Sequence, residues 1–455
     1  MGWELPSDDT YVDIGSADVR GLWDRARIGD GVMSAGISRR RLLGLGAGLS
    51  AMAVAGCGSN SGRPSSGGGG DKPALSQWYH QYGEAGTQQA VERYAKSYPD
   101  ATVSIQWSPG DYDKKTATSL LTDQGPDVFE YGNGPTIDMI KGKQVVELTD
   151  LLGDAKDDFT PSLIERMTYQ DKLYAIPQVV DMQLLVYRKS LLSAAGVQPP
   201  QTVDELLEAA KKLTTDKVKG LFVGNDGGVG VLGGPALWSA GLDYLTEDNQ
   251  FGFDDPAAVE SLRKLRELFT SKTLLLGAPT DWSDPAAFTQ GLTAMQFTGL
   301  WTLPAIQKAF PDDFGVLPWP KLNATTGKPS VPVGAYGSCV NAKSKNIDAA
   351  KKFVKWLWVD QTDDQLDFAQ SYGFHIPARK SLVAKADKLK SGPAADAARF
   401  VNENGHAQTP ILWSPKSGTA YSDALNRIIR GGADPAAEIK KVKAVVDAEL
   451  KRINS

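Results

Sequence analysis

Cys57 is the residue whose surroundings most clearly predict a chemical reaction. It follows two small residues, Ala55 and Gly56, at the end of an apolar run that begins at Leu42. The run is too short to cross a bilayer as a helix, which takes about 20 residues, but it has the length and polarity of the apolar region of a signal peptide. A cysteine thiolate is a nucleophile, so Cys57 could carry a covalent modification.

The residues on either side of the apolar run agree with an exported and anchored chain. Arg39, Arg40 and Arg41 precede the run, and residues 58–73 are almost entirely Gly, Ser and Pro with a few polar residues. A segment of that composition buries too little apolar surface to offset its ordering entropy, so we expect a flexible tether. The alternative is a buried apolar helix with a chance cysteine, which leaves these flanks unexplained.

Two short motifs in this region resemble known signals. Residues 54–57 resemble the lipobox of bacterial lipoproteins, and the Ser-Arg-Arg stretch at 38–40 resembles the twin-arginine export signal. We therefore predict a signal peptide over residues 33–56 and a lipidated Cys57 with its linker over residues 57–73. The protein would lie outside the cytoplasm, held by lipid at the outer face of the cell membrane. Residues 1–32 are polar and aperiodic; we expect disorder, a true start at Met33, or an unusually long leading region.

Composition limits the classes of function that remain. The chain has 455 residues, of which 41% are apolar and 23% charged, and this suits a globular protein with two domains or lobes. A net charge of −5 without a long basic run argues against nucleic acid as a partner. If Cys57 is lipidated, Cys339 has no disulfide partner, and we predict an inert buried thiol. His80, His375 and His406 lie far apart without a zinc motif, so no metal or cofactor is expected.

The order of expected elements after residue 74 predicts an α/β fold. Strands over 102–107 and 125–134 alternate with helices over 87–98 and 114–121, behind a first strand near residue 75, which is the order of a parallel, doubly wound sheet. Thr87 is the expected N-cap of the first helix. Thr202 with Glu205 forms a capping box at the start of a helix over 202–214. Asp434 is the expected N-cap of a last helix over 435–453.

Several phrases of the chain match one family in order and spacing. They are HQYGEAG, GPDVFEYGNG, DKLYAIPQVVDMQLLVYRKSLL, FTQGLTAMQFTGLW, GVLPWP and VGAYGSCVNAKSKNIDAAKKFVKWLW. These phrases resemble the family 1 extracellular solute-binding proteins, the sugar-binding components of ABC importers, a group that includes maltose-binding protein. The resemblance implies two α/β lobes of the periplasmic-binding-protein type, joined by a hinge around a ligand cleft. Lobe one would comprise residues 74–178 and 331–372, and lobe two residues 179–330 and 373–455.

The resemblance also implies a function and a set of cleft residues. A monomer would bind a mono- or oligosaccharide, close over it and be recognised by a membrane permease, without catalysis. Sugars present C–H faces and hydroxyl edges, so their sites combine aromatic planes with carboxylates and amides. Each candidate also has a structural alternative in core packing, capping or turn formation. The candidates are Tyr82, Glu84, Tyr131, Asn133, Asp181, Asn225, Asp226, Trp238, Trp282, Trp301, Gly334, Tyr336 and Trp413.

Two other classes of function remain as alternatives. The same fold could bind a peptide, a polyamine or a metal chelate, but a cleft rich in aromatic residues and amides favours sugar. A secreted glycosidase would need paired carboxylates, for which Asp181 and Glu84 could be considered. No nucleophile motif such as GxSxG appears, and the family phrases account for the surrounding sequence without catalysis.

Overall fold

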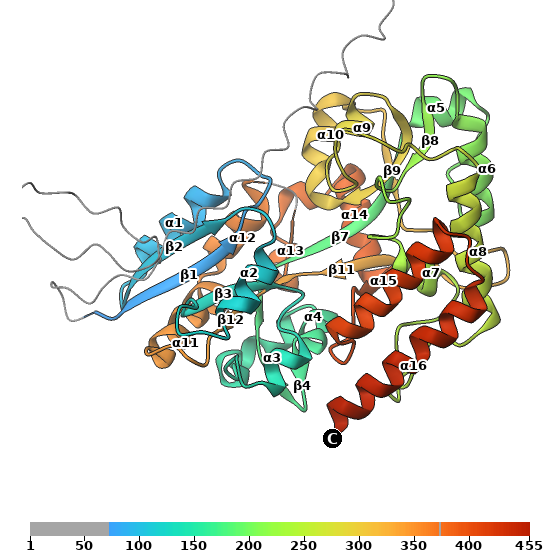
Figure 1. The fold of residues 1–455 in the computed structure, drawn as a ribbon. Coiled ribbons are helices and arrows are strands. Elements are labelled where there is room, and N and C mark those ends of the chain that lie inside the picture. Colours follow the sequence, from blue (N-terminus) through green and yellow to red (C-terminus); the bar gives the residue numbers. More distant parts are fainter. Residues whose placement is uncertain (1–71, 373–374) are drawn as a thin grey trace, which may run out of the picture. The chain divides into compact units, whose positions relative to one another are not determined.

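The computed structural model describes residues 72–372 and 375–455, which belong to one compact unit. The predicted signal peptide, Cys57 and the tether as far as residue 71 lie outside the described residues. Within residues 72–372 and 375–455, no helix combines the length and apolar character that crossing a membrane requires. Two mixed sheets organise this unit, each with its own helices (Figure 1).

The first sheet has the strand order β2-β1-β3-β12-β6. β1 pairs in parallel with both β2 and β3, as the order of elements predicted, whereas β12 runs antiparallel to β3 and β6. The carboxyl ends of β1 and β3 therefore lie at the same edge, where open α/β sheets bind ligands. The strands are β1 (Ala74–His80), β2 (Thr102–Ser108), β3 (Val128–Gly132), β6 (Ile176–Pro177) and β12 (Tyr336–Val340), with a small hairpin of β4 (Thr168–Tyr169) and β5 (Lys172–Leu173).

The helices of the first lobe begin close to their predicted positions. The exception is the cap of α1 (Thr87–Ser97): Gly86, not Thr87, is the N-cap, with φ of 99°. A Cβ atom at Gly86 would lie 2.6 Å from the ring of Tyr372, so both conformation and space require glycine there. The other helices are α2 (Tyr112–Ser119), α3 (Ile137–Lys141), α4 (Pro161–Arg166), α11 (Ile347–Lys355) and α12 (Thr362–Gln370), with a π-helical turn, η4 (Trp356–Asp360), between the last two.

The second sheet is built around β7 (Val179–Tyr187). Its order is β14-β11-β7-β9-β8, with β10 and β13 also paired to β7. We predicted a return to lobe one at Val331, but β11 (Val331–Gly334) still pairs with β7, so the chain crosses back four residues later, at Ala335. The other strands are β8 (Lys219–Phe222), β9 (Thr293–Gly299), β10 (Gly315–Leu317), β13 (Ile376–Pro377) and β14 (Gly405–Ala407).

Two helices of the second lobe confirm the predicted capping residues. The Thr202 side chain accepts a hydrogen bond from the Glu205 N–H at α6 (Val203–Leu213), and Asp434 does the same for the Ala437 N–H at α16 (Pro435–Asn454). The remaining helices of this lobe are α5 (Lys189–Ala194), α7 (Gly233–Ser239), α8 (Pro256–Thr270), α9 (Ala286–Thr289), α10 (Leu303–Ala309), α13 (Lys380–Val383), α14 (Gly392–Asn404) and α15 (Pro415–Ile429), with short 3₁₀ turns η3 (Leu300–Thr302) and η5 (Asp387–Leu389). Two further 3₁₀ turns, η1 (Thr149–Leu151) and η2 (Gly153–Asp158), belong to the first lobe.

Two apolar cores support these sheets. One fills the first lobe and extends over one face of the second sheet, and the other covers the opposite face of that sheet. Alternate residues of β7 divide between them: Leu184 and Val186 join the first core, and Leu185 joins the second, because strand side chains alternate in direction. Cys339 is fully buried in β12, which confirms the predicted buried thiol, and burial raises its pKa well above the usual range.

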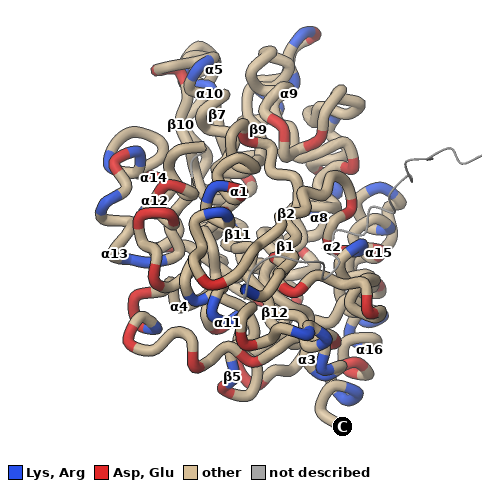
Figure 2. The backbone as a smooth tube through the Cα atoms, turned by 90° about the vertical axis from the view of Figure 1, so that its left-hand side faces the viewer, with Lys and Arg blue, Asp and Glu red and all other residues tan. Residues whose placement is uncertain are grey.

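Charged residues are interspersed over the outer helices and loops, with Lys and Arg alternating with Asp and Glu along the backbone (Figure 2). This distribution agrees with the small net charge of the whole chain. Because the outer surface mixes both signs of charge, a group of like-charged side chains that lines a cavity stands out from it.

Candidate functional site

Two adjoining hollows open between the two sheets. The first, here called the acidic chamber, has a volume of about 810 Å³ and is lined from both lobes by Glu84, Asp113, Asp181, Asp284 and His375, among others. The second, here called the aromatic chamber, has a volume of about 470 Å³ and includes Trp238, Tyr244, Trp282, Trp413 and Tyr421 in its lining. Gly132, Gln183 and Gln408 line both hollows, so the chambers form one cleft.

A carboxylate–imidazole–carboxylate cluster lies in the acidic chamber. The His375 side chain lies 2.6 Å from Asp181 Oδ1 through Nδ1 and 2.7 Å from Glu84 Oε1 through Nε2. Asp181 is on β7, Glu84 is in the loop after β1, and His375 directly precedes β13. Burial alone would lower the pKa of His375, but the charges and hydrogen bonds of Asp181 and Glu84 outweigh it and raise the pKa to about 10. The imidazole is therefore a cation at neutral pH that holds two carboxylates in place.

A second cluster forms the wall of the chamber on the first lobe. Glu130 is fully buried and accepts hydrogen bonds from the Tyr82 hydroxyl at 2.8 Å, from the His80 N–H at 2.7 Å and from the His80 ring. The His80 ring stacks on Tyr336 with centroids 4.0 Å apart and an angle of 13° between the planes. The Tyr82 hydroxyl is thus already bonded inside the wall, and the stacked rings of His80 and Tyr336 line the chamber.

Asp113 adds a poorly satisfied carboxyl group to the acidic chamber. Its Oδ1 atom is buried without a hydrogen-bond partner among the described residues. Burial raises the pKa of this carboxyl to about 6, with a further rise from Glu130, while a hydrogen bond from the Gly132 backbone opposes the rise. A group in this state is suited to accept a hydrogen bond from a ligand.

Two tryptophans of the second lobe lie against each other, Trp301 in the lining of the acidic chamber and Trp282 in that of the aromatic chamber. Trp301 lies on η3 after β9, and its Nε1 donates to the Ser283 carbonyl oxygen at 2.9 Å. Its ring meets that of Trp282 edge to face, with centroids 5.9 Å apart. A Cβ atom on Gly299 would lie 2.1 Å from the Trp301 ring, so this glycine leaves the space into which the indole folds back. The arrangement fixes the orientation of the Trp301 indole in the lining of the acidic chamber.

A row of amides lies where the two chambers meet. Asn133 donates from Nδ2 to Gln408 Oε1 at 2.9 Å, and Gln408 donates from Nε2 to Gln183 Oε1 at 3.3 Å. Asn133 comes from the first lobe and the two glutamines from the second. A Cβ atom on Gly334 would lie 2.4 Å from Asn133 Oδ1, so glycine is required for this row to close.

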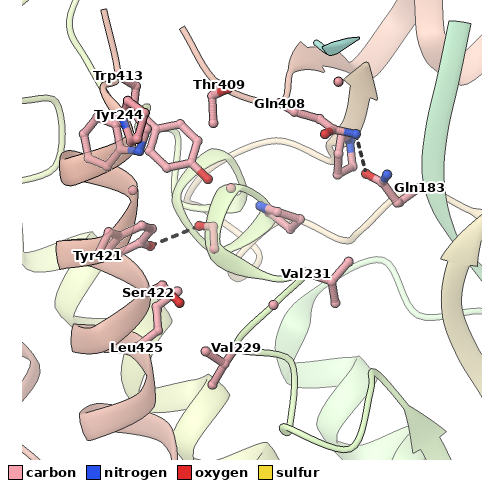
Figure 3. A pocket seen from close by; sticks show the side chains of 18 of the residues that line it. Gln183, Val229, Val231, Tyr244, Gln408, Thr409, Trp413, Tyr421, Ser422 and Leu425 are labelled. Carbon is pink, nitrogen blue, oxygen red and sulfur yellow. Dashed lines mark hydrogen bonds between the residues drawn. The ribbon is translucent and has the colours of Figure 1, made fainter. Parts of the chain in front are cut away.

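The aromatic chamber is walled by side chains that pack on one another. Figure 3 shows Trp413 and Tyr244 lying together, and their ring centroids are 4.8 Å apart. Tyr421 donates from its hydroxyl to the Gly233 carbonyl oxygen at 3.0 Å, and Gln408 reaches toward Gln183 (Figure 3). Trp238 is only 2% exposed and stacks on His406 with centroids 5.0 Å apart. Trp238, Tyr244, Trp413 and Tyr421 thus form part of the wall of this chamber.

Comparison with known proteins decides the family. The sequence profile described as "Bacterial extracellular solute-binding protein" matches residues 78–360. The chain belongs to this family. Membership confirms the predicted family and two-lobe α/β fold, and it places the solute-binding part of the chain outside the cytoplasm. The family binds solutes, so binding is the activity that membership indicates.

Individual relatives support the same assignment for this solute-binding protein. It is 29% identical to the diacetylchitobiose binding protein DasA of Streptomyces coelicolor, over 74% of this chain and 80% of DasA. It is 24% identical to a galactooligosaccharide-binding protein of Bacillus subtilis, over 89% of this chain and 96% of the relative. The solved structure of the GacH receptor of Streptomyces glaucescens, known unliganded and with acarbose, matches at a TM-score of 0.69 and 26% identity and covers 84% of this chain and 99% of its own.

The structure of this solute-binding protein brings ten of the predicted residues into the cleft. Tyr82, Glu84, Asn133, Asp181, Trp301, Gly334 and Tyr336 line the acidic chamber, and Trp238, Trp282 and Trp413 line the aromatic chamber.

The other three predicted residues lie outside the linings of both hollows. Tyr131 packs against the core of the first lobe, edge to face with Phe129. Asn225 binds the backbone of Ala278 and Thr280, and Asp226 accepts hydrogen bonds from the N–H groups of Gly228 and Gly230. The latter two hold loops together, which is the structural alternative considered for them.

Sequence reasoning missed several polar residues of the cleft. Gln183 had a usable signal, since it stands two residues after Asp181 on the same strand and so faces the same side. His375 had none, because it is 194 residues from Asp181 and 291 from Glu84. Besides these two, the missed residues include His80, Asp113, Asp284 and Gln408 in the acidic chamber and Arg166 in the aromatic chamber.

Proposed function

We propose that this protein captures a mono- or oligosaccharide between its two lobes and delivers it to an ABC-type permease in the cell membrane. The observation that carries the proposal is the acidic chamber, whose lining combines the Trp301 indole with carboxylates and amides. Such a pairing suits a sugar, whose ring faces are apolar and whose edges carry hydroxyls. Relatives named for diacetylchitobiose, lactose and galactooligosaccharides agree with this ligand class.

The contacts suggest a role for each group. Asp181 and Glu84 each have one oxygen bound to His375 and one left to accept a sugar hydroxyl. The amide row of Asn133, Gln183 and Gln408 offers both donors and acceptors. Trp301 supplies the stacking surface, and its orientation is fixed by the bond to Ser283.

Closure of the lobes is part of the proposal. The chain crosses between the sheets after β6 and again at Ala335, and a third crossing precedes β13. A ligand that contacts both lobes favours the closed arrangement, because it interacts more strongly with that state than with the open one. The permease would then distinguish loaded from empty protein by the spacing of the lobes.

We also propose that the chain is anchored by lipid at Cys57 after export. The tether of residues 58–73 would keep the binding lobes clear of the membrane surface. Mass spectrometry of the protein from a producing bacterium should find a diacylglycerol-modified N-terminal cysteine at residue 57. Cys57→Ala should release the protein into the medium; a variant that stays in the membrane fraction would refute the anchor.

The test of the ligand class is a calorimetric titration against a panel of mono-, di- and oligosaccharides. Trp301→Ala should weaken binding of the preferred sugar roughly tenfold or more, because stacking and apolar burial are both lost. Trp356→Ala is the matched control, since Trp356 is equally half-buried but packs on Phe353 and Tyr98 away from the cleft. Failure of every saccharide, with binding of a peptide, polyamine or metal chelate, would overturn the sugar assignment.

A further inference from the structure

Arg166 is a buried cation without a counter-ion in the part of the chain that the structure describes. It ends α4 and is only 9% exposed. No carboxylate of the described residues forms an ion pair with it, and the hydrogen bond found for it there is a long one, 3.4 Å from Nη1 to the Pro135 carbonyl oxygen. The Nε atom of Arg166 is buried and has no hydrogen-bond partner among the described residues.

This arrangement costs free energy in the empty protein. A charge removed from water needs a partner of opposite charge to offset the loss of hydration. Burial accordingly lowers the pKa of the Arg166 guanidinium to about 10, which still leaves it charged at neutral pH. The ionisable neighbour that affects Arg166 is Cys339, whose buried thiol is neutral under those conditions.

Arg166 lines the aromatic chamber. Of the described residues that line this chamber, it alone carries a charged side chain. The adjoining acidic chamber has the opposite character. Its described lining residues include Glu84, Asp113, Asp181 and Asp284 but no lysine or arginine, and protonated His375 offsets one of these four carboxylates. Charge is therefore separated along the cleft. A negative group on a ligand would be repelled at one end and attracted at the other.

We infer that the natural ligand is a saccharide with one anionic substituent, a carboxylate or a phosphate, which binds Arg166 in the aromatic chamber. This inference rests on the proposed sugar-binding function and narrows its ligand class. The anion supplies the counter-ion that Arg166 lacks, through the planar donor group that matches carboxylate and phosphate oxygens. The neutral part of the saccharide occupies the acidic chamber, where its hydroxyls donate to the carboxylates.

The experiment compares matched ligands on matched variants of the full-length chain. The ligands are oligosaccharides of glucose and of galactose, each in a neutral form, a uronate-terminated form and a phosphorylated form, together with sodium acetate and inorganic phosphate as anions alone. The variants are Arg166→Met, which keeps most of the volume, and Arg166→Lys, which keeps the charge. Arg188→Met is the control, because Arg188 is also largely buried but is paired with Asp313 at 2.6 Å. Binding is measured by calorimetry and unliganded stability by thermal unfolding.

The acidic form of one sugar should bind at least about tenfold more tightly than its neutral form, since hydrogen bonds to a charged group are among the stronger ones. Whichever of the uronate and phosphorylated forms binds more tightly shows whether the natural anionic group is a carboxylate or a phosphate. Arg166→Met should abolish this preference, and Arg166→Lys should retain part of it. The melting temperature of unliganded Arg166→Met should stay equal or rise, whereas that of Arg188→Met should fall.

Each contrary result has a definite meaning. If neutral sugars bind as well as acidic ones, or if the acidic preference survives in Arg166→Met, the anion site is refuted while the sugar-binding function stands. A fall in melting temperature for Arg166→Met as large as that for Arg188→Met, without a change in ligand preference, makes Arg166 structural and also refutes it. If no saccharide of either kind binds, the proposed sugar-binding function is refuted. In that case, stabilisation by acetate or phosphate that is lost in Arg166→Met still supports the anion site. If neither anion stabilises the protein, the anion site is refuted as well.

Discussion

Replacing His375 with Gln should remove a pH-dependent part of the stability. The pKa of His375 is raised from 6.5 to about 10, and its side chain is only 6% exposed. One pH unit corresponds to about 1.4 kcal/mol, so protonated His375 contributes ~5 kcal/mol below pH 6.5. Because the folded-state pKa is the higher one, this contribution declines as pH rises, to ~3 kcal/mol at pH 8 and to nothing near pH 10.

Urea unfolding at a series of pH values from 6 to 10 measures this effect. The difference in unfolding free energy between wild type and His375→Gln should shrink by about 1.4 kcal/mol per pH unit above pH 6.5. His406→Gln is the control: burial lowers the pKa of His406, so its effect on stability should be flat above pH 6.5. A difference between wild type and His375→Gln that does not change between pH 6.5 and 9 would show that the imidazole is not a cation between Asp181 and Glu84.

Two further changes test other parts of the acidic chamber. Asp113→Asn should raise the unfolding free energy at pH 7 by up to ~3 kcal/mol, measured by urea unfolding. The reason is that a carboxyl whose folded-state pKa is about 6 rather than 3.8 destabilises the fold once it is ionised. No gain at pH 7, or the same gain at pH 4, would contradict this. Gly334→Ala should weaken ligand binding about tenfold or more and cost about 1–3 kcal/mol of stability, since its Cβ displaces Asn133 and Gln408. Gly83→Ala, where a Cβ has open space and, as at Gly334, φ is not positive, is the control for replacing a glycine without steric overlap. Equal losses of stability in both variants would refute the steric argument.

The fold was more accessible from the sequence than the site. Hydrophobic periodicity and capping residues act over a few positions, so the starts of α6 and α16 could be located to the residue from Thr202 and Asp434. The crossing at Ala335 was misplaced by one strand, because β11 is apolar whichever sheet it joins. Family phrases supplied the two-lobe arrangement, which local patterns alone do not specify.

The site depends on contacts between distant parts of the chain. A glycine-rich loop after a strand looks alike whether its polar residues bind a ligand or hold the loop, and Asn225 and Asp226 do the latter. Arg166 has the ordinary appearance of a basic residue in the last turn of a helix, where cations are favourable. Its burial, and therefore its missing counter-ion, follows only from the packing of α4 beside β14 and β6.

The position of His375 links ligand binding to the arrangement of the lobes. Its imidazole joins Glu84 of the first lobe to Asp181 of β7, and Asp181 is also paired through the backbone with Gly334, one residue before the chain crosses at Ala335. A sugar whose hydroxyls donate hydrogen bonds to the remaining oxygens of Asp181 and Glu84 therefore contacts the same two segments that His375 already connects. The walls formed by Trp301 and by Trp413, in contrast, are built within the second lobe alone. We therefore expect a sugar to bind first to these aromatic surfaces and to contact the first lobe only as the lobes approach. Trp301→Ala should then weaken the initial binding, whereas Glu84→Gln should chiefly reduce closure. Closure is measured as the change in radius of gyration on adding ligand. Equal loss of closure in both variants, at saturating ligand, would refute this order.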